Sequence, residues 1–167
     1  MAKLDVRILG DPVLRKKADE VPEITPELRR LIDDMFETMY AEEGVGLAAP
    51  QVGISQRVIV VDPHEEGTTG FALINPVVRE VGKQLDRGEE GCLSIPGLKD
   101  IVERPLNVVV EGLTPEGENK RIEAEGLLAR ILQHEIDHID GILFIDRLSP
   151  LKRKLLLKKW QKTKPDA

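Results

Sequence analysis

Two histidines one helical turn apart, with an acid directly after the first, constrain one segment of this chain more than any other feature. They are His134 and His138, and the acid is Glu135. In a helix, positions i and i+4 lie on one face, so both imidazoles can bind the same metal ion. Glu135 then projects about 100° away and can act on metal-bound water as a general base. The spacing predicts a helix with a hydrolytic metal site, although two buried histidines without a metal fit the same motif.

The residues around this motif have the periodicity of a helix that ends at Gly141. On a helical wheel, both histidines and Glu135 share an apolar arc of about 160°. An ionised carboxylate on such an inward face costs several kcal/mol unless other groups compensate its charge. The polar residues that face the other way are Arg130, Gln133, Asp137 and Asp140.

The remaining segments predict an α+β fold. Thr25 and Pro26 are a favourable N-cap and first helical residue, and helical spacing continues to Gly44. Ser149 and Pro150 open a last helix, which runs to about residue 162. We therefore expect short antiparallel β-sheets packed around the central metal-ligand helix, with one N-terminal and one C-terminal helix. The expected strands are 57–61, 71–75, 77–81, 108–112 and 120–124.

Length and composition limit the organisation and the compartment. A chain of 167 residues without a repeat or linker fits one catalytic domain, residues 1–167, in which a basic C-terminal helix and tail begin at about residue 148. No apolar run approaches the roughly 20 residues that cross a bilayer, and the first residues lack a signal core. Cys92 is the one cysteine, which excludes an intramolecular disulfide. We expect a cytoplasmic protein without membrane contact.

A glycine-rich segment, residues 44–51, follows the first predicted helix. Its glycines, Gly44 and Gly46, let a loop backbone approach a ligand closely. Gln51 can donate an amide hydrogen bond to a developing oxyanion. A purely structural turn between a helix and a strand is the alternative.

The cysteine lies in a third segment, residues 89–94. As a thiolate, Cys92 gives three protein ligands together with the two histidines and leaves a fourth position for water, as in catalytic metal sites. A small buried side chain is the alternative for an isolated cysteine. Arg104 is a candidate partner for Glu90, although the two can equally form a solvated charge pair.

Residues 44–51, 90–94 and 133–138 resemble the three signature motifs of the peptide deformylases, in that family's order and approximate spacing. Residues 74–76 and 94–97 also resemble the family, so the likeness extends to about residue 150. Position 99 departs from the pattern, because Lys99 stands near a place where some members use an arginine to hold the substrate backbone. The resemblance implies removal of the formyl group from the N-terminal formyl-methionine of newly synthesised polypeptides.

The resemblance also implies a role for each motif residue. Cys92, His134 and His138 would bind the metal, which the family usually carries as Fe²⁺ and which Zn²⁺, Ni²⁺ or Co²⁺ can replace. Catalysis would fall to Glu135 as general base and acid, and to the Gln51 amide and the Leu93 backbone N–H as oxyanion donors. The substrate would be held by Val45, Gly46, Gly91, Leu127 and Ile131.

The basic tail suggests a partner. Residues 152–167 carry seven of the 24 Lys and Arg residues and one of the 30 acids, whereas the acidic remainder argues against DNA binding. Some family members dock such a helix on the ribosome, and the cations could contact ribosomal RNA. The alternative is an amphipathic helix packed through Leu151 and Leu155.

Two other functions fit the metal motif. One is a peptidase that cleaves internal amide bonds, although its third ligand usually follows the motif instead of preceding it. The other is a structural metal site, closed by a fourth ligand such as His64.

Overall fold

The structure is a computed structural model that describes residues 2–67 and 69–163. Its α-helices are α1 (Pro26–Ala41), α2 (Leu127–Ile139) and α3 (Pro150–Thr163). Short 3-10 helices span Pro12–Arg15, Ala49–Val52 and Phe144–Arg147. The strands are β1 (Gly46–Ala48), β2 (Val58–Val61), β3 (Phe71–Val81), β4 (Leu85–Cys92), β5 (Ile95–Pro105), β6 (Asn107–Leu113) and β7 (Asn119–Glu125).

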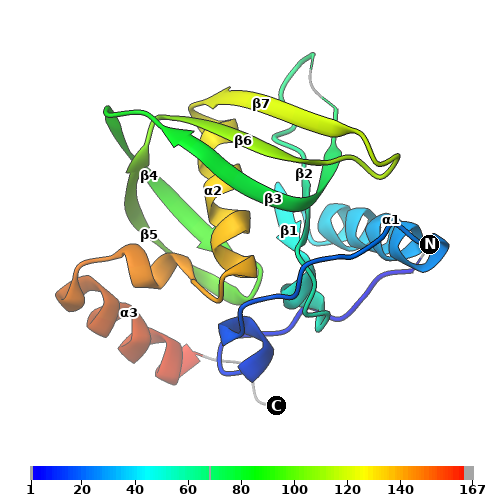
Figure 1. The fold of residues 1–167 in the computed structure, drawn as a ribbon. Helices are drawn as coiled ribbons and strands as arrows, with labels where there is room; N and C mark the ends of the chain where they lie inside the picture. The colour runs from blue at the N-terminus through cyan, green and yellow to red at the C-terminus, as the bar shows by residue number, and fades with distance from the viewer. Residues whose placement is uncertain (1, 68, 164–167) are drawn as a thin grey trace.

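The strands form two antiparallel sheets, with α2 between them (Figure 1). One sheet has five strands in the order β1-β2-β3-β6-β7, and the other is the β4–β5 hairpin. The predicted α+β class, with antiparallel sheets around the motif helix and helices near both ends, is confirmed.

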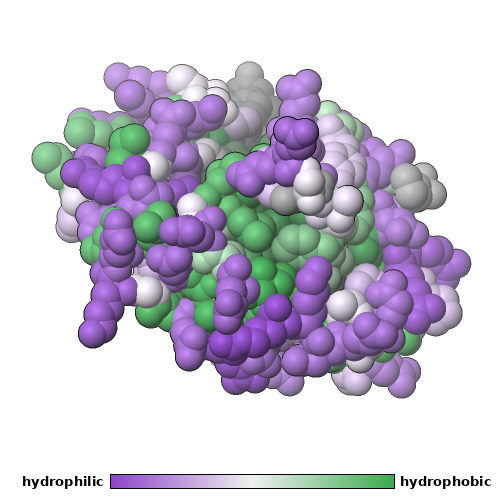
Figure 2. All heavy atoms as spheres, turned by 90° about the horizontal axis from the view of Figure 1, so that it is seen from above, coloured by the Kyte–Doolittle hydropathy of each residue, from purple (hydrophilic) through white to green (hydrophobic). Residues whose placement is uncertain are grey.

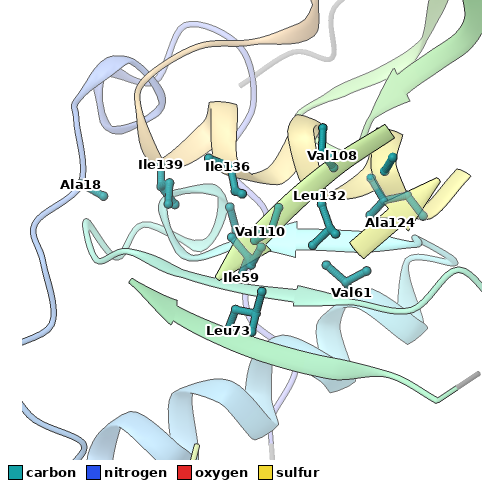
Figure 3. Close-up of a cluster of buried hydrophobic side chains, with 13 residues drawn as sticks. Ala18, Ile59, Val61, Leu73, Val108, Val110, Ala124, Leu132, Ile136 and Ile139 are labelled. Atoms are coloured by element: carbon teal, nitrogen blue, oxygen red, sulfur yellow. The ribbon is translucent and has the colours of Figure 1, made fainter. Parts of the chain in front are cut away.

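Strand β2 shows how the layers are held together. All four of its residues are buried. Ile59 and Val61 pack against α2, where Leu132, Ile136 and Ile139 point toward the sheet (Figure 3). Val58 and Val60 point to the opposite face and pack with apolar residues of α1. Because successive side chains of a strand alternate between faces, the five-stranded sheet is covered by α1 on one side and by α2 on the other.

The first helix begins as predicted. The Thr25 side chain accepts a hydrogen bond from the backbone N–H of Leu28 at 3.1 Å, and Pro26 is the first helical residue. The helix ends at Ala41, and Glu43 then takes a left-handed conformation with φ of 57°. This turn directs the chain into β1.

The observed strands differ from the sequence-based prediction at three places. Residues 71–75 and 77–81 form one strand, β3, whose register with β6 shifts at the position of Asn75. The segment predicted as a glycine-rich loop contains strand β1, which pairs with β2. The β4–β5 hairpin was not predicted, because its sequence is polar and lacks clear alternation.

The last helix packs differently from the predicted arrangement. Leu151 and Leu155 are 67% and 54% exposed, so packing through these two residues is wrong. The helix instead buries Leu156 and Trp160 in a cluster with Leu14 and Phe144. Residues 164–167, the end of the predicted basic tail, lie outside the described residues.

The surface is mixed in character. Figure 2 shows apolar side chains gathered near the middle of one face, surrounded by hydrophilic ones. Within residues 2–67 and 69–163, no helix combines the length and the apolar character needed to cross a bilayer.

Candidate metal centre

The predicted ligands from two distant segments meet in space. Cys92 ends β4, and its Sγ lies 3.3 Å from His138 Nε2. His134 Nε2 lies 3.2 Å from the same nitrogen. A tetrahedral ion with metal–nitrogen bonds of about 2.0 Å and a metal–sulfur bond of about 2.3 Å keeps neighbouring ligand atoms about 3.3 to 3.6 Å apart. The observed spacing therefore fits one metal ion held by Cys92, His134 and His138.

The residue considered as a fourth ligand lies elsewhere. His64 Nε2 is 3.1 Å from the carbonyl oxygen of Gly44, and its backbone N–H donates to Asp62. The metal-capable group found among the described residues does not include His64. The structure therefore gives no support to a site closed by this histidine.

A buried carboxylate orients one of the ligands. His134 Nδ1 lies 2.9 Å from Glu90 Oε1, which turns Nε2 of the same ring toward Cys92 and His138. Burial alone would raise the pKa of Glu90, but hydrogen bonds from His134 and Arg104 outweigh it and lower that pKa to about 2. Ligand histidines commonly donate their second nitrogen to such a group. The predicted partnership of Glu90 with Arg104 is confirmed, as a buried pair rather than a solvated one.

The pair belongs to a larger charge network behind the site. Arg104 also donates to Asp137 at 3.0 Å, and Arg130 donates to Glu90 at 2.6 Å. Asp137 accepts further hydrogen bonds from Arg147. The polar side of α2 is thus buried against charged partners, which the helical wheel alone could not identify.

Glu135 follows His134 in α2, and both residues line the same cleft. Its side chain is buried, and Oε1 has no hydrogen-bond partner among the described residues. Burial raises the pKa of Glu135 to about 7. A general base works best with a pKa near the working pH, so the carboxylate suits proton transfer.

Gly46 makes room for this carboxylate. A Cβ at position 46 would lie 2.6 Å from Glu135 Oε2 and 2.9 Å from its Cγ. Both distances are too short for non-bonded atoms, so only glycine allows β1 to approach Glu135 this closely.

We predict that Gly46→Ala displaces the Glu135 carboxylate. Misplacing a catalytic group by about 1 Å can cost about a hundredfold in rate. If Glu135 is the general base of a metal-dependent hydrolysis, the kcat of that hydrolysis should fall roughly 10- to 100-fold. Metal content should stay unchanged, because Gly46 contributes no ligand. Steady-state kinetics and elemental analysis of the same sample check this, and a wild-type kcat would show that Glu135 tolerates the added methyl group.

Gln51 presents its amide nitrogen to the centre. Its Oε1 accepts the backbone N–H of Ala48 at 2.9 Å, which fixes the orientation of the amide. Its Nε2 lies 3.1 Å from Ser94 Oγ and 3.5 Å from Cys92 Sγ. The donor predicted from the sequence therefore lies beside the proposed metal ligand.

A cleft with a volume of about 460 Å³ opens onto these residues. Its lining includes Glu135, Gln51 and Leu93, the three predicted catalytic residues. It also includes Lys99, whose Nζ lies 4.0 Å from Glu89. All five predicted substrate-binding residues line it as well: Val45, Gly46, Gly91, Leu127 and Ile131.

Two of these residues expose apolar side chains to the cleft and one is buried. Val45 and Leu127 are 38% and 44% exposed, whereas Ile131 is buried. Arg130 also lines the cleft, and sequence analysis did not assign it to the site. Its helical position beside Ile131 was the available signal.

Comparison with known proteins identifies the family. The family model for polypeptide deformylases matches residues 3–154. The chain belongs to the polypeptide deformylase family. A peptide deformylase of Thermodesulfovibrio yellowstonii is 51% identical over 166 residues, which cover 98% of this chain and 100% of that protein. One from Halothermothrix orenii is 54% identical over 157 residues, which cover 93% and 100% of the two chains.

Solved deformylase structures share the fold. A crystal structure of peptide deformylase from Ehrlichia chaffeensis in complex with actinonin matches with a TM-score of 0.91 and 38% identity, covering 99% of this chain and 100% of that one. A peptide deformylase from Synechococcus elongatus in complex with actinonin gives a TM-score of 0.90 at 43% identity, covering 99% and 94%. The resemblance inferred from the three motifs is therefore confirmed across the whole length of the deformylase fold.

Proposed function

We propose that this chain hydrolyses the N-formyl group from the N-terminal formyl-methionine of newly synthesised polypeptides. The observation that carries the proposal is the meeting of Cys92, His134 and His138 beside the buried carboxylate of Glu135 in one cleft. Membership of the polypeptide deformylase family supports the same reaction. We treat residues 1–167 as one catalytic unit that acts in the cytoplasm, where a reducing environment keeps the Cys92 thiol available.

The donor set fits a divalent transition metal. One thiolate and two imidazoles suit iron, zinc, nickel and cobalt, so the ligands alone do not choose among them. We propose Fe²⁺ as the resident ion, one per chain, with Zn²⁺, Ni²⁺ or Co²⁺ as substitutes. When bound, the ion makes a water molecule more acidic and polarises the formyl oxygen.

Glu135 moves the proton in this reaction. Its buried carboxylate accepts a proton as water attacks the formyl carbon, and it then gives that proton to the departing amine. The formyl C–N bond breaks, which releases formate and a free α-amino group. The Gln51 side-chain amide and the Leu93 backbone N–H donate hydrogen bonds to the developing oxyanion.

The cleft supplies methionine specificity. Val45, Leu127 and Ile131 form an apolar surface that can receive an unbranched thioether side chain. Gly46 of β1 and Gly91 of β4 line the same cleft and complete the proposed substrate-binding surface. Lys99 of β5, which pairs with Gly91 of β4, also lines the cleft and provides a positive charge for the substrate backbone.

The product pattern tests the proposed function. Metal-loaded protein, purified without oxygen, should convert formyl-Met-Ala to formate and Met-Ala. A peptidase with the same metal motif would instead release formyl-Met and alanine. Detection of formyl-Met as the main product would overturn the proposal.

The last helix supports ribosome docking as a finer part of the proposed function. Leu151 and Leu155 are exposed on α3 beside lysine and arginine residues, including Lys152, Lys154 and Lys159. Cations with nearby apolar side chains suit a surface of RNA and protein. Co-sedimentation with ribosomes that weakens as salt rises would support this contact, and salt-independent absence of binding would reject it.

His64→Ala distinguishes the proposed catalytic site from a structural metal site in which His64 is the fourth ligand. We expect His64→Ala to keep its metal and to turn over substrate at a rate close to that of the wild-type protein. The reason is that His64 Nε2 contacts the Gly44 carbonyl oxygen and does not belong to the ligand group. Elemental analysis of the purified variant checks this. A loss of bound metal would show that His64 closes the site as a fourth ligand.

A further inference from the structure

Ser94 is a fully buried hydroxyl residue in the turn between β4 and β5. Its Oγ lies 3.1 Å from Nε2 of Gln51, which is itself only 1% exposed. This partner of Ser94 is the side chain proposed as an oxyanion donor.

Two hydrogen bonds fix the plane of the Gln51 amide. The Ala48 backbone N–H holds Oε1, and Ser94 Oγ accepts one of the two N–H groups on Nε2. With Oε1 held alone, the amide could still rotate about that contact. The second hydrogen bond removes this freedom and leaves the other N–H directed toward Cys92 Sγ, at 3.5 Å.

Residues 7–9, near the N-terminus, form hydrogen bonds with the backbone carbonyl groups of Gln51 and Ser94. The Arg7 N–H donates to the Gln51 carbonyl at 2.6 Å, and the Leu9 N–H donates to the Ser94 carbonyl at 2.8 Å. The two donors are only two residues apart in the chain, so they hold the two acceptors close to each other. If the Ser94 hydroxyl were removed, the backbone could not move inward to compensate.

We infer that Ser94 is a positioning residue. It holds the Gln51 amide so that the second N–H of Nε2, which is directed at Cys92 Sγ, stays beside the metal ligands and can donate to the oxygen of the scissile formyl group. The inference rests on the proposed function, because it requires Gln51 to stabilise the oxyanion. Ser94 itself would contact neither the substrate nor the metal, because it does not line the cleft and does not belong to the Cys92, His134 and His138 group. Its contribution is to the orientation of a neutral donor, which benefits the transition state more than the bound substrate.

A double-mutant cycle on the metal-loaded protein tests this inference. Ser94→Ala should lower kcat for formyl-Met-Ala by roughly two- to tenfold, the usual net effect of one neutral hydrogen bond, with little change in KM. Gln51→Ala should cost more, about 100-fold or above. In the Gln51→Ala background, adding Ser94→Ala should change kcat by less than about twofold, since there is no longer an amide to position.

Thr25→Ala provides a matched control. The Thr25 hydroxyl accepts an N–H at the same distance of 3.1 Å, but it caps α1 and does not line the cleft. This variant should lower the melting temperature without changing kcat. Ser94→Thr keeps the hydroxyl and should retain most of the activity, even if Ser94→Ala folds poorly.

The kinetics of these variants distinguish failure of the oxyanion role of Gln51 from failure of the positioning role of Ser94. If Gln51→Ala keeps wild-type kcat, the proposed oxyanion role fails, and the inference fails with it. If Gln51→Ala is impaired but Ser94→Ala is not, or if the two losses are additive, Ser94 does not act through Gln51 and the inference alone is overturned. Loss of kcat in Ser94→Thr equal to that in Ser94→Ala would also contradict it.

Discussion

Glu135→Gln should keep its bound metal and lose about 100- to 10,000-fold in kcat for formyl-Met-Ala. General acid–base catalysis typically contributes a factor of this size. Glutamine nearly matches the glutamate in shape, so it should fit beside Gly46, where space is limiting. It cannot accept a proton from the attacking water or return one to the departing amine. Steady-state kinetics with metal content measured on the same sample would show both effects.

Glu118→Gln is the matched control for this substitution. Glu118 is exposed directly before β7 and does not line the cleft, so its replacement should leave kcat unchanged. Near-normal deformylation by Glu135→Gln would remove the proposed base. Loss of metal from that variant would instead assign Glu135 a part in metal binding.

Arg104→Met should destabilise the fold by about 3 to 5 kcal/mol, the usual cost of removing one partner from a buried ion pair. Arg104 is 4% exposed and lies between the carboxylates of Glu90 and Asp137. Without its charge, both acids stay buried with fewer partners. For a chain of this size the melting temperature should fall by roughly 10 °C or more. Urea unfolding and calorimetry measure the change.

Arg121→Met tests whether the stability lost on removing an arginine depends on its burial or only on the number of carboxylates near it. Arg121 is near three carboxylates, those of Glu80, Glu111 and Glu123, but its side chain is 46% exposed. Exposed ion pairs contribute about 0 to 1 kcal/mol, so this variant should lose little stability. Equal losses in the two variants would contradict the importance assigned to the buried network.

The helices that carry the site were predictable because their signals are local. The spacing of His134 and His138, with apolar residues at helical intervals, predicted α2 within two residues of its observed end at Ile139. The start of α1 followed from Thr25 and Pro26, whose cap geometry depends on neighbouring residues alone. Period and capping are properties of single segments, so no partner needed to be known.

The β4–β5 hairpin was not predictable in the same way. Its strand Leu85–Cys92 contains two glycines and four charged residues, a composition that favours loops. The strand forms because β5 pairs with it and because Glu90 finds Arg104, Arg130 and His134 around it. These partners are distant in sequence, so the local sequence of the segment does not reveal the contacts that stabilise it as a strand.

The site residues also fall into those that local motifs predict and those whose roles depend on contacts between distant segments. The metal ligands, Glu135 and Gln51 belong to motifs that the sequence shows directly. The roles of Arg130 and Asp137 depend on contacts between segments as far apart as Asp86 and Arg147, which no single motif contains. Gly46 was predicted as a close-approach residue, but its contact with Glu135 required the position of β1 against α2.

X-ray absorption spectroscopy of the metal-loaded protein tests most directly whether Cys92, His134 and His138 hold the ion, because it counts the atoms bound to the metal. The proposed site should show one sulfur and two imidazole nitrogens, and the sulfur signal should be absent from a Cys92→Ser sample prepared in the same way. A wild-type spectrum without sulfur, or one with a third imidazole or another side chain completing the shell, would contradict this ligand set.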